Sequence, residues 1–98
     1  MNLFQHTHNY IVSYDLNGPN PSHAAMDRHI QAGCVKYGRV LETVWYIQSA
    51  LPLPQMYEYL NRILSENDRI IVVDANDAFM RNLLVSIPSI QEAWALAA

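Results

Sequence analysis

Charged residues are scarce in this chain. Asp, Glu, Lys and Arg make up 15% of its 98 residues, where about 25% is usual. The six Lys and Arg residues are outnumbered by nine Asp and Glu, so the formal net charge is −3. This balance argues against a general nucleic-acid coat protein, because such a protein presents a broad basic surface to the phosphates. The net charge does not exclude a local basic patch on a dimer.

The chain also lacks the segments and motifs that mark several other classes. Cys34 is the only cysteine, so no internal disulfide can form. No apolar run reaches the ~18 residues of a membrane span, and residues 1–8 do not have the charged and then apolar pattern of a signal peptide. There is no P-loop, dinucleotide fingerprint, Cys-x-x-Cys or nucleophile elbow. We therefore expect a cytoplasmic protein without a membrane partner.

Apolar residues, by contrast, are abundant. They make up 51% of the chain, whose length is that of one small domain spanning 1–98. A domain of this size leaves a large part of its surface exposed. Because few of its residues are charged, some of that surface is expected to be apolar and to be buried by self-association.

The first half of the domain shows a strand followed by a helix. Tyr10–Leu16 is rich in β-branched and aromatic residues and predicts a strand. The Gly and Pro residues of Gly18–Pro21 end it. Ser22 is a suitable N-cap for a helix predicted over His23–Tyr37, and Gly38 is expected to end that helix.

The second half predicts three more strands and a second helix. Arg39–Ser49 is too long for one strand in a small domain and is interpreted as two strands with a tight turn near Glu42–Val44. Pro54–Ser65 predicts a helix that begins at proline. Arg69–Ala75 predicts the last strand, which is apolar on both faces. Residues 76–98 are expected to form a short helical tail.

The resulting order, β-α-β-β-α-β, predicts an α+β domain of the ferredoxin-like type. Right-handed crossovers would place both helices on one face of a four-stranded antiparallel sheet, with a core over 9–75. The other face of the sheet needs cover, because the last strand is not polar on either side. We expect a homodimer through that face or through an edge strand; cover by the tail is the alternative.

Asp15 and Asp68 are the candidate site residues. The predicted topology brings three loops to one end of the sheet: the end of the first strand at Asp15, the turn near Thr43, and the loop around Asp68. Two carboxylates in one place are typical ligands of Mg²⁺ or Mn²⁺. The alternative for Asp15 is a turn aspartate that binds nearby backbone N–H groups.

Three segments resemble a known family. Tyr14-Asp15-Leu16, then Tyr37-Gly38-Arg39-Val40-Leu41-Glu42-Thr43-Val44-Trp45, then Asn67-Asp68-Arg69-Ile70-Ile71-Val72-Val73 are similar to the CRISPR-associated Cas2 proteins. The likeness covers about 10–75. It is closer still to small Cas2-like proteins labelled SinR-like, and the VapD toxins share the general form.

The resemblance implies a ferredoxin-like homodimer that acts on RNA or DNA. It implies that Asp15 of each subunit faces the other across a cleft and holds a divalent metal. The resulting hypothesis is a metal-dependent endonuclease in phage defence, counter-defence or a toxin–antitoxin setting, with Asp15 catalytic. The loop at 17–23 contains no Lys or Arg, which departs from the family. A second hypothesis is therefore a non-catalytic dimerisation or protein-interaction module of the same fold.

Overall fold

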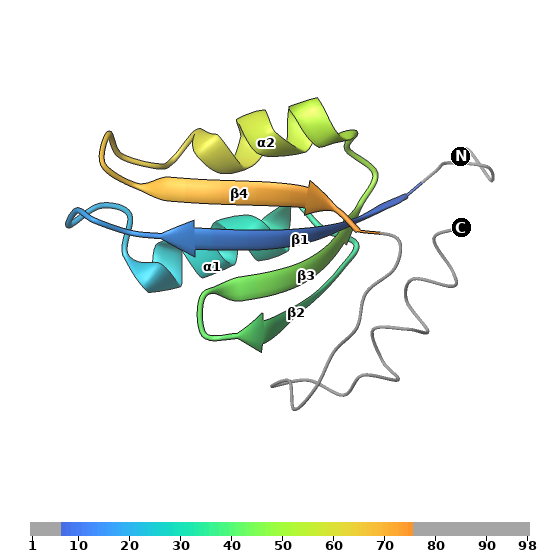
Figure 1. The fold of residues 1–98 in the computed structure, drawn as a ribbon, viewed down its shortest axis with the longest axis horizontal. Helices are drawn as coiled ribbons and strands as arrows, with labels where there is room; N and C mark the ends of the chain where they lie inside the picture. Colours follow the sequence, from blue (N-terminus) through green and yellow to red (C-terminus); the bar gives the residue numbers. More distant parts are fainter. Residues whose placement is uncertain (1–6, 76–98) are drawn as a thin grey trace.

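The computed structural model describes residues 7–75 (Figure 1). Its elements follow in the order β1 (His8–Asp15), α1 (His23–Ala32), β2 (Lys36–Leu41), β3 (Val44–Ser49), α2 (Leu53–Asn61) and β4 (Arg69–Asp74). Within these residues the strands form one antiparallel sheet in the order β2-β3-β1-β4. The predicted α+β class, order of elements and four-stranded antiparallel sheet are confirmed. The predicted helical tail at 76–98 lies outside the described residues.

Helix α1 begins where the sequence predicts and ends earlier. The Ser22 side chain accepts a hydrogen bond from the backbone N–H of Ala25 (3.1 Å), which confirms Ser22 as the N-cap. The prediction that the helix continues to Tyr37 is wrong, because the structure places the C-cap at Gly33. Two residues later the Val35 N–H already donates to the Gln48 carbonyl of β3 (2.7 Å). Pairing with the sheet thus ends the helix, and Gly38 lies within β2 rather than at a helix end.

The turn between β2 and β3 falls where the sequence predicts it. Glu42 and Thr43 alone separate the two strands. Helix α2 then begins after Pro52, with a proline in its first turn, and ends at Asn61 rather than at the predicted Ser65. The Leu64 N–H donates to the Asn61 carbonyl (3.1 Å), a three-residue step tighter than that of an α-helix. No helix within residues 7–75 is long and apolar enough to span a membrane.

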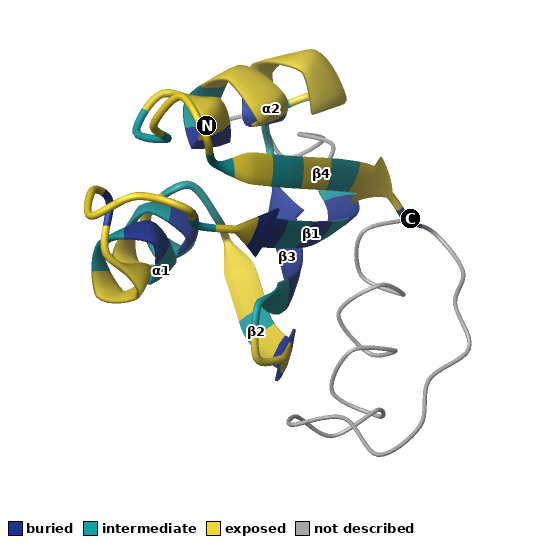
Figure 2. Ribbon diagram, turned by 60° about the vertical axis from the view of Figure 1, so that its left-hand side comes forward, coloured by how far each residue is buried: buried dark blue, intermediate teal, exposed yellow. Residues whose placement is uncertain are grey.

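The core lies between the helices and one face of the sheet. Alternate residues of β1 point into it, because side chains alternate across a strand. Figure 2 shows both helices on the same side of the sheet, with buried residues on the central strands. The buried cluster consists of Tyr10, Val12, Tyr14, Met26, Ile30, Trp45, Ile47, Met56 and Leu60.

Two side chains, His29 and Tyr59, join the two helices. Their rings stack at 4.1 Å between centroids with 9° between the planes. The Tyr59 hydroxyl donates to the His29 carbonyl (2.6 Å), and Nε2 of His29 lies 2.6 Å from the Tyr59 carbonyl oxygen. Gly33 lies against the same tyrosine ring. The helices therefore contact each other through backbone and side chain together.

The other side of the sheet, which we call the open face, carries exposed apolar side chains on its two edge strands, whereas Asn9, Tyr46 and Gln48 on the central strands are buried. One row runs across the strands as Leu41, Val44, Ser13 and Ile71. In the neighbouring row Ile11 lies opposite Val73. Ile71 is 59% exposed, Leu41 49% and Val73 44%. Monomeric proteins rarely leave grouped apolar side chains in water, so this face is a candidate for contact with a partner.

Candidate functional site

Asp15 lies at the end of β1 on the open face, directly opposite Arg69 of β4. The backbone groups of Tyr14 point toward β3, since its N–H donates to the Thr43 carbonyl (3.2 Å). Those of Asp15 therefore point toward β4, because successive residues of a strand alternate in direction. The Cα atoms in such pairs are about 5.5 Å apart. The sheet itself holds the two side chains together.

The ion pair between Asp15 and Arg69 is exposed and long. One guanidinium nitrogen of Arg69 lies 3.8 Å from Oδ2 of Asp15, and the two side chains are 80% and 62% exposed. Exposed pairs of this kind contribute about 0–1 kcal/mol to stability. The pair is therefore not explained by a large contribution to folding, and both groups are accessible to a ligand.

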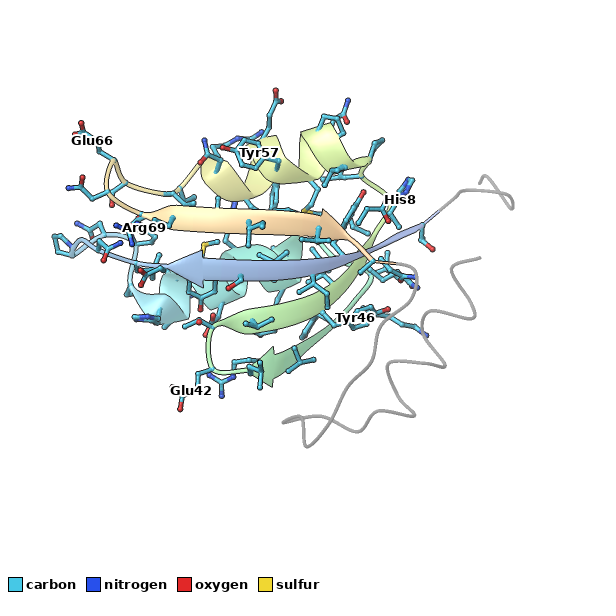
Figure 3. All side chains as sticks on the ribbon, in the orientation of Figure 1. His8, Glu42, Tyr46, Tyr57, Glu66 and Arg69 are labelled. Atoms are coloured by element: carbon cyan, nitrogen blue, oxygen red, sulfur yellow. The ribbon has the colours of Figure 1, made fainter. Side chains whose placement is uncertain are left out.

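A shallow hollow surrounds this pair. Its volume is about 360 Å³, and it is a wide depression open to solvent, not an enclosed cavity. Figure 3 shows Arg69 where β4 begins beside the end of β1, with Glu66 in the loop before it and Glu42 at the β2–β3 turn. The hollow is lined by Ser13, Tyr14, Asp15, Thr43, Arg69, Ile70 and Ile71.

Asp68 lies at the same end of the molecule, as predicted from the topology, and its carboxylate is hydrogen-bonded within the loops. Its Oδ1 accepts the backbone N–H of Asn17 (2.7 Å), and its Oδ2 accepts the backbone N–H (2.8 Å) and hydroxyl (2.7 Å) of Ser65. The Asn17 amide adds a bond to the Asn67 carbonyl (2.9 Å). Asp68 thus fastens the loop after β1 to the loop before β4. The three donors lower the pKa of its carboxyl, with the Asn17 N–H as the largest cause.

The donor set of a single chain does not by itself complete a divalent-cation site. Both oxygens of Asp68 already accept hydrogen bonds from Asn17 and Ser65, and Asp15 brings one carboxylate. Residues 7–75 contain no group of three or more His, Cys, Asp or Glu side chains that could hold a metal ion. Coordination of Mg²⁺ or Mn²⁺ by Asp15 and Asp68 therefore stays a prediction, and it would require further ligands.

The sequence predicted the location of the site better than its members. The C-terminal end of β1 does contact the β2–β3 turn, as the hydrogen bond from Tyr14 to Thr43 shows. The loop containing Asp68 lies at the same end of the sheet, hydrogen-bonded to the loop after β1. The topology also predicted Arg69 at this end of the sheet, but without a role in the site. The signal that would have found it is strand register, because residues 15 and 69 are opposite each other once β1 and β4 are paired.

We expect acid to weaken the loop junction at Asp68. Because the pKa of Asp68 is lower in the folded chain than in the unfolded chain, its ionised form stabilises the fold above the unfolded value and loses that effect as pH falls through the lowered pKa. Asp68→Asn should lower the thermal midpoint at neutral pH, and this deficit should shrink below about pH 4. Circular dichroism melts at both pH values measure it.

Glu66→Gln is the matched control for this prediction. It removes one carboxylate from the same exposed loop without removing any of the three bonds to Asp68. Its melting midpoint should stay closer to that of the wild type. Equal losses for the two variants at neutral pH would show that the Asp68 bonds do not hold the loops.

Comparisons with known proteins give no relative for this chain. No family model, no curated protein and no solved structure matches it.

Proposed function

We propose that this chain is a Cas2-like protein of ferredoxin-like fold, which acts as a homodimer on RNA or DNA. The strand order β2-β3-β1-β4, with both helices on one face, supports the fold assignment. The position of Asp15 carries the functional assignment. It is exposed at the end of β1, on the same face as the apolar rows that a second copy would cover.

The open face supports the dimer. Ile71 and Val73 are exposed apolar residues on an edge strand, and Leu41 extends the apolar surface to the opposite edge. A two-fold axis near the end of β1 would bury these side chains between two copies. It would also bring the two copies of Asp15 toward each other, so that the dimer supplies the second carboxylate that one chain lacks.

Phosphodiester hydrolysis is the reaction that we assign to this dimer. Mg²⁺ or Mn²⁺ held by the two Asp15 carboxylates would supply a Lewis acid that polarises the phosphate. The chain's own contribution is to hold Asp15 in the open hollow where β1 ends and β4 begins. The setting we propose is phage defence, counter-defence or a toxin–antitoxin system.

A specific observation favours the second candidate, a non-catalytic dimerisation or protein-interaction module. Both carboxylate oxygens of Asp68 already accept hydrogen bonds from loop residues, and Asp15 forms an ion pair with Arg69. If the protein is such a module, the open face binds another protein, and Asp15 and Asp68 have no catalytic role.

Nuclease assays on the purified chain separate the two candidates. Short RNA and DNA strands are incubated with Mg²⁺ or Mn²⁺ and with wild-type, Asp15→Asn or Glu66→Gln protein. We expect cleavage by the wild type and by Glu66→Gln, and none above background by Asp15→Asn. Cleavage that survives Asp15→Asn would place the activity elsewhere. If the wild type cleaves neither RNA nor DNA, the endonuclease hypothesis is contradicted and the non-catalytic interaction module is favoured.

Light scattering on the same preparations tests the dimer. The wild type should have twice the mass of one chain, and Ile71→Arg should have the mass of a single chain, because it places a charge at the most exposed apolar side chain of the open face. Tyr57→Arg is the matched control, since Tyr57 is 45% exposed on α2. A wild type that is monomeric at micromolar concentration would contradict the proposal.

A further inference from the structure

We propose that Arg69, with Ser13 and Thr43, forms a phosphate-binding subsite for nucleic acid that Asp15 masks by ion pairing. The inference rests on the proposed function, because it concerns the same end of the sheet. It goes further by naming the group that binds the phosphate and by giving Asp15 a second, electrostatic role.

The position of Arg69 makes it available to an anion. The β1–β4 ladder places its backbone opposite Asp15, at the edge of the hollow. A guanidinium carries five N–H donors, and the contact with Asp15 joins one nitrogen to one oxygen at 3.8 Å. Because 80% of the side chain is exposed, the guanidinium is accessible to an anion in solution. Such a fork matches the paired oxygens of a phosphate.

The rest of the hollow has the chemistry of a phosphate contact. Arg, Ser and Thr are among the side chains that bind phosphate oxygens in nucleic-acid complexes. Ser13 and Thr43 line the hollow together with Arg69 and Ile71. The hollow therefore combines a guanidinium with two hydroxyl-bearing residues, a set that suits the oxygens of a phosphate.

Asp15 opposes the binding of that phosphate. Its carboxylate repels the anion and competes with it for the guanidinium, and together the two side chains carry no net charge. Removing the charge of Asp15 should therefore strengthen anion binding, with the loop and the sheet unchanged. This sign is opposite to the one expected if Asp15 were simply part of a structural contact.

The test measures binding of a short fluorescein-labelled oligo(dT), with oligo(rU) as a second probe, by fluorescence anisotropy at low salt. The full chain is used, with a chelator present so that metal-dependent cleavage cannot occur. We expect Arg69→Ala to bind about tenfold more weakly, the effect of losing one charge-assisted hydrogen bond. Asp15→Asn should bind about fivefold more tightly, and Asp15→Asn with Arg69→Ala should lose that gain.

Two controls remove equal charges elsewhere. Arg62 lies over the Tyr59 ring at 5.9 Å on the helix side, so Arg62→Ala should bind as the wild type does. Glu66→Gln removes a neighbouring carboxylate and should change affinity less than Asp15→Asn. The proposal fails if Arg69→Ala binds normally, if Arg62→Ala loses as much, if Glu66→Gln gains as much as Asp15→Asn, or if neither the wild type nor Asp15→Asn binds.

A negative result in the binding test and a negative result in the nuclease assay would contradict different proposals. The expected affinities without cleavage would leave the subsite in place and remove hydrolysis from the proposed function. Cleavage that depends on Asp15, with no effect of Arg69 on affinity, would overturn the subsite alone. Circular dichroism spectra of each variant confirm that the comparison is made between folded proteins.

Discussion

Leu60→Ala is expected to lower the free energy of unfolding by about 2–5 kcal/mol. Leu60 is completely buried, and with Met56 it forms the buried side of α2. The substitution removes apolar atoms from water-free surroundings and leaves a cavity that the neighbouring side chains fill only in part. Because small domains have about 5–15 kcal/mol of stability in total, the loss should be plain in urea denaturation followed by circular dichroism.

Leu53→Ala makes the same chemical change at the start of the same helix. Leu53 is 37% exposed, so its truncation should change the unfolding free energy by about 0.5 kcal/mol or less. Both variants are compared with the wild type at one protein concentration, because dimer formation would make stability depend on concentration. Similar losses at the two positions would mean that α2 does not pack on the sheet through Leu60.

Gly33→Ala should destabilise the fold by about 1–3 kcal/mol, as overpacking does. The backbone does not need glycine here, since its φ of −92° is open to alanine. The obstacle is the Tyr59 ring, because a Cβ at position 33 would lie 2.9 Å from Cζ and closer still to Cε2. The ring cannot move aside without losing its stack on His29 and the hydrogen bond to the His29 carbonyl.

The effect of Gly33→Ala should reverse in a Tyr59→Ala background. With the ring absent, alanine restricts the unfolded chain and should stabilise the protein by about 0.4–1 kcal/mol. Thermal melts of the four proteins in this double-mutant cycle give the sign of each change. A loss that persists in the Tyr59→Ala background would show that something other than the ring disfavours alanine at this position.

Much of the fold could be predicted because its elements carry local signals. Ser22 has the side chain of an N-cap, and Met26 and Ile30 recur at helical spacing and are buried. The end of α1 could not be predicted in this way, since Cys34 and Tyr37 continue the helical spacing. What ends the helix is a bond from Val35 to Gln48 of β3, a long-range contact that no local pattern reports.

The candidate site was predictable in place but not in detail. Topology alone brings the end of β1 and the start of β4 together, so Asp15 and Asp68 were expected at one end of the sheet. The two carboxylates look alike in sequence, and the donors around them differ. Asp68 accepts bonds from Asn17 and Ser65, whereas Asp15 faces Arg69 across the ladder. Those partners depend on loop conformation and register, which composition does not reveal.

Because side chains alternate between the two faces of β1, the same strand positions both the core residues and the candidate site. Tyr10, Val12 and Tyr14 point to the helices, and Asp15 points to the open face, within a single unbroken strand. Inserting or deleting one residue within β1 would exchange the two sets. It would direct the carboxylate at the helices and the two tyrosines at solvent. In evolution, changes of length should therefore be absent from this strand and confined to the loops beside it.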